Sequence, residues 1–234
     1  MKKLLITTYN FIGKKYLSLI LNAEQKKKPF KVINERSTEY LFALKYLRML
    51  CPGDVLDIGS GKSSWPHLLS TCGFKVKAID KMGNYWDSFF NRHYKIDNED
   101  ITDPKTKQKF QFITCLSVLE HIPNHLRAMV NIHNMLEDNG RLVLTFPYNE
   151  DFYHSNIYKH PQAGYGQDAN FITQVFSRAS IDEWLSATSF EIVEQKYYRV
   201  FTGALWTIGK RLTPCEEVTR FHNHHLTCIL LKKI

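Results

Sequence analysis

The sequence has no run of about 18 apolar residues, so no membrane-spanning helix is predicted. The apolar start at residues 1–6 resembles a signal peptide, but Thr7, Thr8 and Lys14 interrupt it, so secretion is not expected. The five cysteines are odd in number and widely spaced, and no Cys-x-x-Cys pair occurs. This usage is typical of reduced thiols and disfavours both a disulfide framework and a zinc site. We therefore expect a cytoplasmic protein.

Two common catalytic motifs are also missing. The Gly-Lys-Ser run at residues 61–63 resembles the end of a P-loop, but Leu56 stands where that motif requires its first glycine. No His-Glu-x-x-His zinc motif occurs. A cluster of histidines does enter the last predicted strand: His222, His224 and His225. Because alternate residues of a strand point to opposite faces, no metal site is expected there.

Positive charge is scarce outside the first 34 residues. Residues 1–34 hold eight lysines and one acid, Glu24, which gives +7 of the chain's net +8 and leaves +1 for the other 200 residues. A nucleic-acid enzyme would spread basic residues over its binding face, so no nucleic-acid partner is expected. We separate a basic N-terminal segment, residues 1–34, from a main domain at residues 35–234.

A helical pattern runs through residues 3–22. At 100° per residue, one side carries apolar residues: Leu5, Tyr9, Ile12, Tyr16, Leu19 and Ile20. The opposite side carries polar ones: Thr7, Asn10, Lys14, Ser18 and Asn22. Two interpretations stay open. A helix packed on the main domain is favoured, because many such helices cap a core. The alternative is a basic amphipathic helix on an anionic membrane surface, which would place the protein at the inner face of the membrane.

The main domain begins with a predicted helix at residues 36–50 and then alternates apolar runs with helical stretches. Strands are predicted at residues 54–59, 75–80, 92–96, 111–116, 140–147, 189–196 and 226–232. Helices are predicted at residues 64–72, 84–90, 124–136 and 180–187. This alternation is typical of a parallel sheet with helical crossovers. The long aromatic segment at residues 147–177 is predicted to be a lid or a substrate-binding insertion.

The stretch Val55–Gly61 predicts a buried strand that runs into a tight turn on Gly59 and Gly61. A dinucleotide-binding turn would need a third glycine for close helix–strand packing, and Ser64 stands at that place. Asp80 ends the second predicted strand, where a carboxylate can accept hydrogen bonds from vicinal ribose hydroxyls.

Two further motifs follow in order. An acidic turn after the third strand contains Asp100-Ile101, with Asp97 as a competing acid. The run at residues 112–123 contains the string Val-Leu-Glu-His-Ile after the fourth strand. Together the four motifs resemble class I S-adenosylmethionine-dependent methyltransferases of the small-molecule branch, over roughly residues 50–150.

The resemblance implies a Rossmann-like, doubly wound, mostly parallel sheet of seven strands in the order 3-2-1-4-5-7-6, with helices on both faces. It implies S-adenosylmethionine as the cofactor and S-adenosylhomocysteine as its product. The implied cofactor contacts are Asp57, Gly59, Ser60, Gly61, Asp80, Lys81, Asp100, Ile101, Leu116 and Ser117. The sequence departs from the family at Ser63, where a third glycine is usual, and at Gln111, where an acid usually precedes the fourth strand.

The acceptor is expected to be a small molecule methylated on oxygen or nitrogen, with a glycan or a lipid-linked precursor as possible classes. Candidate catalytic residues are His121 and His154, because imidazole titrates near neutral pH. Tyr148, Tyr153 and Tyr165 are the candidate substrate-binding residues. A cofactor-binding protein without transfer activity and a membrane-surface interaction protein are the alternatives. The oligomeric state is not predicted.

Overall fold

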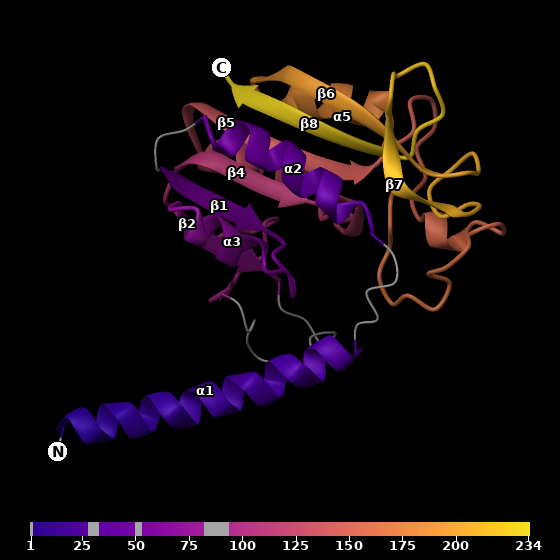
Figure 1. Cartoon of the computed structure of the whole chain (residues 1–234). Coiled ribbons are helices and arrows are strands. Elements are labelled where there is room, and N and C mark those ends of the chain that lie inside the picture. Colours follow the sequence, from indigo (N-terminus) through magenta and orange to yellow (C-terminus); the bar gives the residue numbers. More distant parts are fainter. Residues whose placement is uncertain (1, 28–32, 50–52, 82–93) are drawn as a thin grey trace. The chain divides into compact units, whose positions relative to one another are not determined.

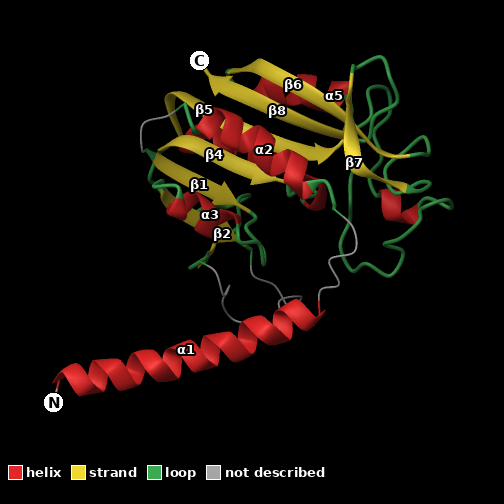
Figure 2. Ribbon diagram, viewed as in Figure 1, coloured by secondary structure: helices red, strands yellow, loops and turns green. Residues whose placement is uncertain are grey.

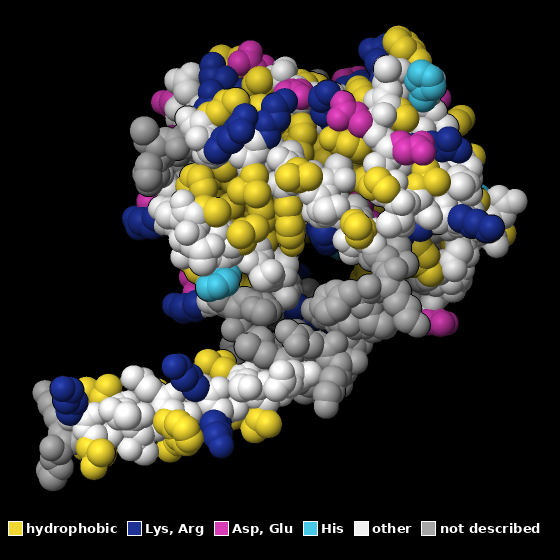
Figure 3. Space-filling model, in the orientation of Figure 1, with side chains coloured by type: hydrophobic (Ala, Val, Ile, Leu, Met, Phe, Trp, Pro, Cys, Tyr) yellow, Lys and Arg dark blue, Asp and Glu magenta, His cyan; other side chains and the backbone are white. Residues whose placement is uncertain are grey.

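The computed structural model describes residues 2–27, 33–49, 53–81 and 94–234. The chain divides into two compact units, Met1–Ile33 and Asn34–Ile234. The first unit contains one long helix, α1 (Lys2–Lys27; Figure 1). Hydrophobic side chains and lysines both appear along its surface (Figure 3). No helix in the described ranges is both long enough and apolar enough to cross a bilayer.

The second unit is built on an eight-stranded sheet in the order β3-β2-β1-β4-β5-β8-β6-β7 (Figure 2). The strands are β1 (Asp54–Ile58), β2 (Lys75–Asp80), β3 (Asp97–Asn98), β4 (Phe110–Leu116), β5 (Leu136–Pro147), β6 (Phe190–Phe201), β7 (Arg211–Val218) and β8 (Leu226–Lys233). The pairs from β3 through β5 are parallel, whereas β8 is antiparallel to both β5 and β6. The predicted Rossmann-like α/β class is confirmed.

Helices cover both faces of this sheet. They are α2 (Arg36–Leu47), α3 (Trp65–Thr71), α4 (His125–Met135) and α5 (Arg178–Ala187), with 3-10 turns η1 (Leu119–His121) and η2 (Ile157–Lys159). Local sequence sets several of their starts. Pro66 occupies the first turn of α3, where its missing N–H costs nothing. Ser177 and Ser180 form a capping box at the start of α5.

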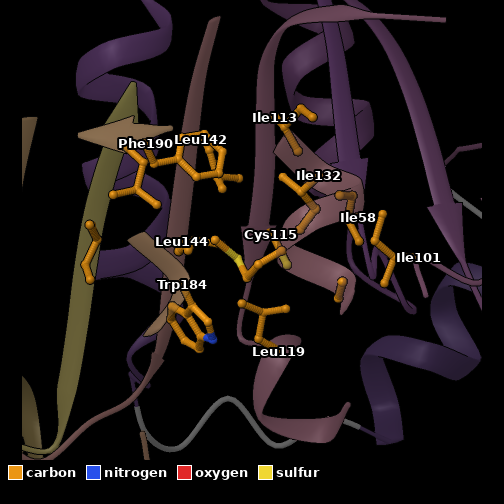
Figure 4. Packing of buried hydrophobic residues seen from close by; sticks show 14 of the residues in the cluster. Ile58, Ile101, Ile113, Cys115, Leu119, Ile132, Leu142, Leu144, Trp184 and Phe190 are labelled. Carbon is orange, nitrogen blue, oxygen red and sulfur yellow. The ribbon is translucent and has the colours of Figure 1, made fainter. Parts of the chain in front are cut away.

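Neighbouring residues of the central strands enter two separate cores. Val55 packs with the buried face of α2 and with α3, whereas Leu56 packs with α4 and α5 on the other side of the sheet. Figure 4 shows part of the second core, where Ile132 and Trp184 come from these helices and Leu144 from β5. Burial on both faces makes the central strands continuously apolar, which is why their positions could be predicted.

The sheet differs from the prediction at its two edges. The strand β7 was not predicted, because residues 211–218 contain Pro214 and two glutamates, lie on an edge with none of them buried, and have no apolar pattern. The other seven strands keep the expected order. A third strand was predicted at residues 92–96, of which 92 and 93 lie outside the described residues. The strand that the structure shows in this region is β3, the two-residue strand Asp97–Asn98. The helix predicted at residues 84–90 lies outside the described residues.

Candidate functional site

The glycine turn lies at the carboxyl end of β1, and its two glycines serve different purposes. Both have positive φ, +72° at Gly59 and +53° at Gly61, which favours glycine. A Cβ on Gly59 would lie 2.3 Å from Cγ2 of Val118, so the residue is also required for packing. Among the residues that the structure describes, a Cβ on Gly61 would meet no atom nearer than 3.9 Å. These residues therefore leave room for a ligand to approach the backbone at Gly61.

Two predicted cofactor contacts, Asp57 and Ser60, hold the turn together from within. The buried Asp57 carboxylate accepts hydrogen bonds from Ser60 Oγ at 2.6 Å and from Thr114 Oγ1 at 2.7 Å. Trp65 Nε1 donates in turn to Thr114 Oγ1 at 3.3 Å. Burial raises the pKa of Asp57 to about 7, against the two hydroxyl bonds, which lower it. In this arrangement both side chains shape the turn instead of presenting polar atoms outward.

Asp80 stands beside the glycine turn because β1 and β2 are adjacent parallel strands in register. Its carboxylate Oδ2 accepts the backbone N–H of Gly61 at 2.8 Å. The residue is only 6% exposed, so the carboxylate is held in a fixed position. A carboxylate at the carboxyl end of a strand is a group that can accept hydrogen bonds from ligand hydroxyls.

Asp100 lies in the acidic turn after β3, where one ion pair and two hydrogen bonds hold its carboxylate in place. Lys81 Nζ lies 2.7 Å from its Oδ2, and the backbone N–H and hydroxyl of Thr102 donate to its Oδ1 at 2.8 and 2.7 Å. Burial alone would raise the pKa of Asp100, but these bonds outweigh it and lower the pKa. Ile101 is buried in the core. The competing acid, Asp97, lies in β3 and pairs with lysines instead.

A buried polar cluster joins the end of β4 to α2, and none of the motifs found in the sequence includes it. The hydroxyls of Ser117 and Thr145 both donate to Oε1 of Glu39, which is fully buried. Arg36 donates to Oε2 of Glu39 and to the carbonyl oxygen of Leu116, each at 3.0 Å. The predicted contacts Leu116 and Ser117 are thus held in place by α2. An Arg-x-x-Glu spacing at a helix start was the only available signal, and it is common on exposed helices.

Glu120 lies beside this cluster and is 3% exposed. Its Oε2 has no hydrogen-bond partner among the residues that the structure describes. Burial raises its pKa to about 8, although the positive charge of Arg36 lowers it. At neutral pH the folded chain therefore holds this carboxyl in its protonated form.

Replacing Glu120 by glutamine is expected to remove a pH dependence of stability. The folded-state pKa is about 8 and the ordinary value is 4.5, so between them the unfolded chain binds fewer protons. The free energy of unfolding therefore falls as pH rises through this window. Between about pH 5 and about pH 9, the free energy of unfolding of Glu120→Gln should rise relative to that of the wild type by a few kcal/mol, on the order of the pKa difference. Urea unfolding measures this.

The control for that comparison is Glu183→Gln, because Glu183 is exposed on α5. This variant should follow the wild-type pH dependence. If Glu120→Gln also keeps the wild-type slope, the assignment of a buried, protonated carboxyl at this position is wrong.

His121 ends η1 and faces the insertion. Its Nδ1 lies 2.8 Å from the carbonyl oxygen of Ile172, so Nδ1 carries the proton and donates it. The ring packs edge-on against Phe171 at 5.0 Å between centroids. Burial lowers the pKa of His121, which keeps the imidazole neutral at pH 7. Its side chain stays 37% exposed, and its Nε2 lies 3.9 Å from Oε1 of Glu120.

The insertion is an ordered loop that folds back along its own length. His154 pairs through its backbone with Val175, and Gln174 pairs with the carbonyl oxygen of Glu120 at 2.9 Å. These bonds bring the end of the insertion against η1. The predicted insertion therefore borders His121 at the carboxyl edge of the sheet.

The candidate substrate tyrosines occupy different environments. Tyr153 is 46% exposed and donates to Oε1 of Gln174 at 2.6 Å, next to the residues around His121. Tyr165 is 39% exposed and accepts from Arg211 of β7 at 3.0 Å. Tyr148 is fully buried, stacks on His224 and donates to Glu150 at 2.8 Å. Its packing assigns Tyr148 to the core beneath the insertion, not to a ligand-facing surface.

The second candidate base, His154, is partly buried within the insertion. Its ring lies edge-on to that of His160, at 6.2 Å between centroids. Burial and the neighbouring His160 lower its pKa. In the described part of the chain, no side-chain hydrogen bond or ring contact joins His154 to His121. The structure therefore does not bring the two histidines together.

The histidines at the start of β8 make separate structural contacts. His225 lies 2.9 Å from the carbonyl oxygen of Gly203, His224 stacks on Tyr148, and His222 bonds the hydroxyl of Thr219. Within residues 2–27, 33–49, 53–81 and 94–234, no group of three acidic, cysteine or histidine side chains is placed to hold a metal ion.

Two surface hollows lie away from this constellation. One, of about 330 Å³, is lined by residues 102–108 and by part of α4. The other, of about 310 Å³, is lined by Met49, by Gln111 near the start of β4 and by residues 137–141 in the first half of β5. Both hollows lie toward the amino ends of the parallel strands β4 and β5. The glycine turn, Asp80 and His121 instead lie at the carboxyl ends, where ligands of open α/β sheets bind.

Comparison with known proteins identifies the family of the chain. A family model described as a methyltransferase domain matches residues 23–195. Among curated relatives, a ubiquinone biosynthesis O-methyltransferase of Coxiella burnetii is 27% identical over 129 residues, which cover 52% of this chain and 53% of the relative. One from Xanthomonas campestris pv. campestris is 26% identical over 133 residues, covering 53% and 54%. The chain spans about half the length of the curated relatives it matches.

Solved structures show the same fold at low sequence identity. The 1,6-didemethyltoxoflavin-N1-methyltransferase of Burkholderia thailandensis, with bound S-adenosylhomocysteine, has a TM-score of 0.56 at 14% identity, covering 96% of this chain and 89% of its own. The N-methyltransferase NodS of Bradyrhizobium japonicum has a TM-score of 0.53 at 14% identity, covering 87% and 89%. At these identities the likeness establishes the fold alone.

Proposed function

The chain belongs to the methyltransferase-domain family, in its class I, S-adenosylmethionine-dependent form, and from this premise we propose that it methylates an oxygen or nitrogen atom of a small molecule. The curated relatives that it matches are named O-methyltransferases, whereas the structural neighbours include N-methyltransferases. The observation that carries the proposal is the glycine turn fixed to Asp80, because it combines an open backbone surface with a positioned carboxylate.

The residues at this edge fit S-adenosylmethionine. Gly61 leaves space that a Cβ would otherwise occupy, and Asp80 offers acceptor oxygens of the kind that bind ribose hydroxyls. Asp100, fixed by Lys81 and Thr102, offers an acceptor for an amino group such as that of adenine. When bound, the cofactor supplies a methyl group that is already electrophilic on its sulfonium. The chain's task is then to hold the acceptor in line, and proximity provides much of the rate.

The acceptor is proposed to lie between η1 and the insertion. Three exposed aromatic side chains of the insertion support an acceptor with a ring-shaped or apolar body: Phe152, Tyr153 and Phe171. A glycan or a lipid-linked precursor stays within this proposal, since sugar rings and isoprenoid chains both pack on aromatic faces. Arg36, Glu39 and Ser117 set the shape of the nearby end of β4.

For a hydroxyl acceptor, we propose His121 as the general base. The Ile172 carbonyl holds the proton on Nδ1, so Nε2 has a free lone pair that can accept a proton from the acceptor. The lowered pKa keeps this nitrogen unprotonated at pH 7. An amine acceptor that is already neutral would not require this step.

His121→Gln is expected to lower kcat for a hydroxyl acceptor by about a hundredfold with little change in KM for the cofactor. The wild-type rate should fall with decreasing pH once His121 protonates, below the ordinary histidine value of 6.5. The variant should lose this acid limb. His133→Gln is the matched control, because His133 lies on α4 and bonds the Ser189 hydroxyl. A variant that keeps both the rate and the acid limb would exclude His121 as the base.

The transfer itself is tested with S-adenosylmethionine and a panel of phenols, sugars and amines, with catechol as the simplest aromatic hydroxyl acceptor. Mass spectrometry should detect an acceptor heavier by one methylene unit, together with S-adenosylhomocysteine. Phenols and amines in the same panel separate O- from N-methylation. Tight cofactor binding by calorimetry without product from any acceptor would favour the non-catalytic alternative.

A further inference from the structure

The first unit carries an apolar surface that no function of the methyltransferase domain uses. Viewed along α1 at 100° per residue, one side forms an apolar stripe. We define this stripe as Leu5, Ile6, Tyr9, Ile12, Tyr16, Leu17 and Leu19. Each of these side chains is at least half exposed, from 50% at Leu17 to 79% at Tyr9. A continuous apolar surface of this kind marks an interaction site.

The opposite side of α1 carries most of the polar and basic residues. It holds Thr7, Asn10 and Ser18 together with Lys3, Lys14 and Lys15, and two exposed apolar residues, Leu4 and Phe11, lie among them. The helix as a whole contains six lysines and one acid, Glu24. A strong positive charge on the polar side and tyrosines within the stripe are both typical of helices that lie in a membrane interface.

From this arrangement we propose that α1 lies in the interface of an anionic membrane, with the apolar stripe in the acyl boundary and the lysines among the phosphates. A second copy of the chain fits less well, because two such helices would bring like charges together. The main domain also offers little charge complementarity, since the residues after position 34 carry a net charge of only +1. Anionic lipid complements both the charge and the apolar surface.

The same helix does not fit a transmembrane orientation. Its 26 residues could span a bilayer in length, at about 1.5 Å per residue. However, Lys14 and Lys15 lie at its middle, where they would sit in the hydrocarbon core. No helix of the described residues meets the requirement for crossing a membrane. The proposal is therefore of a helix parallel to the surface.

The test is sedimentation of the full chain with vesicles. The chain should sediment with vesicles of equal parts phosphatidylglycerol and phosphatidylcholine, and not with phosphatidylcholine alone. High salt should release it, because screening weakens attraction between lysines and anionic headgroups. Lys14→Gln with Lys15→Gln should weaken binding by at least about tenfold, since each lysine near an anionic surface contributes roughly fivefold.

A matched pair of variants tests whether vesicle binding depends on the apolar stripe itself or on exposed apolar residues anywhere on α1. Leu5→Asn with Ile12→Asn removes two members of the stripe, whereas Leu4→Asn with Phe11→Asn removes two exposed apolar residues from the basic side. The first variant should lose binding by about tenfold or more, and the second by less than about threefold. Because transfer activity is not measured, the result does not depend on the proposed function.

Several results would overturn the proposal. One is equal binding to neutral and anionic vesicles, and another is equal loss in the two matched variants. Absence of sedimentation would also overturn it. Light scattering and thermal unfolding would then show whether a second copy of the chain or the chain's own main domain covers the apolar stripe. A dimer that Leu5→Asn with Ile12→Asn dissociates indicates a second copy, and a lowered melting temperature of that variant indicates packing on the chain's own domain.

Discussion

Replacing Asp80 by alanine is expected to weaken S-adenosylmethionine binding by at least about a hundredfold. The carboxylate is nearly buried at the end of β2 and already accepts the Gly61 N–H at 2.8 Å. In the proposed complex it also accepts two ribose hydroxyls, and hydrogen bonds to a charged group contribute about 1.5–3 kcal/mol each. Isothermal titration calorimetry measures the change directly.

Two control variants make the Asp80 result specific. Asp103→Ala removes a carboxylate whose side chain is 89% exposed, and it should leave the affinity unchanged. Asp80→Asn keeps one oxygen to accept the Gly61 N–H but loses the charge, so its affinity should fall between those of the wild type and Asp80→Ala. If Asp80→Ala keeps both its affinity for S-adenosylmethionine and its melting temperature, the cofactor does not bind at this edge of the sheet.

Alanine at the two glycines of the turn is expected to have opposite kinds of effect. In Gly59→Ala the new Cβ would lie 2.3 Å from a methyl carbon of Val118, at a φ of +72°. The resulting strain and repacking should lower the free energy of unfolding by about 2–5 kcal/mol. In Gly61→Ala the nearest atom to the new Cβ among the described residues is the Gly59 carbonyl oxygen, at 3.9 Å, so the positive φ should be the main cost to stability, about 1–2 kcal/mol.

For cofactor affinity we expect the reverse order: Gly61→Ala, which loses less stability, should lose more affinity. Gly61→Ala, once folded, should lose most of its S-adenosylmethionine affinity, because its Cβ occupies the open surface beside Asp80. Gly59→Ala with Val118→Ala should recover part of the lost stability by removing the clashing methyl groups. Urea unfolding and calorimetry on the same samples give both quantities. Equal stability losses in the two single variants would contradict the distinction between a packing glycine and a ligand-facing glycine.

The central sheet could be predicted from sequence because its strands are buried on both faces. Apolar runs at β1, β4 and β5 predict such strands even when the neighbouring strands are not known. The edges could not be predicted in this way. In β7 no residue is buried and Pro214 interrupts the pattern, so the strand exists only through its pairing with β6.

The candidate site residues divide in the same way. Some could be predicted from local sequence, and others depend on contacts between distant parts of the chain. The glycine turn and Asp80 are local signals, because turn geometry and strand ends follow from the chain itself. Glu39 and Arg36 could not be found, because their partners Ser117 and Leu116 lie about 80 residues away. Tyr148 illustrates the opposite error, since an aromatic residue in a loop gives no sequence sign that it stacks beneath the loop on His224.

The most direct test of the account is a crystal structure of the chain with S-adenosylhomocysteine. The ribose hydroxyls should lie within hydrogen-bond distance of the Asp80 carboxylate, with the homocysteine part beside Gly59 and Gly61. The sulfur should face His121 and the insertion. Binding in the hollow formed by residues 102–108 and α4, or a pose that leaves Asp80 without a ligand contact, would contradict the proposed site.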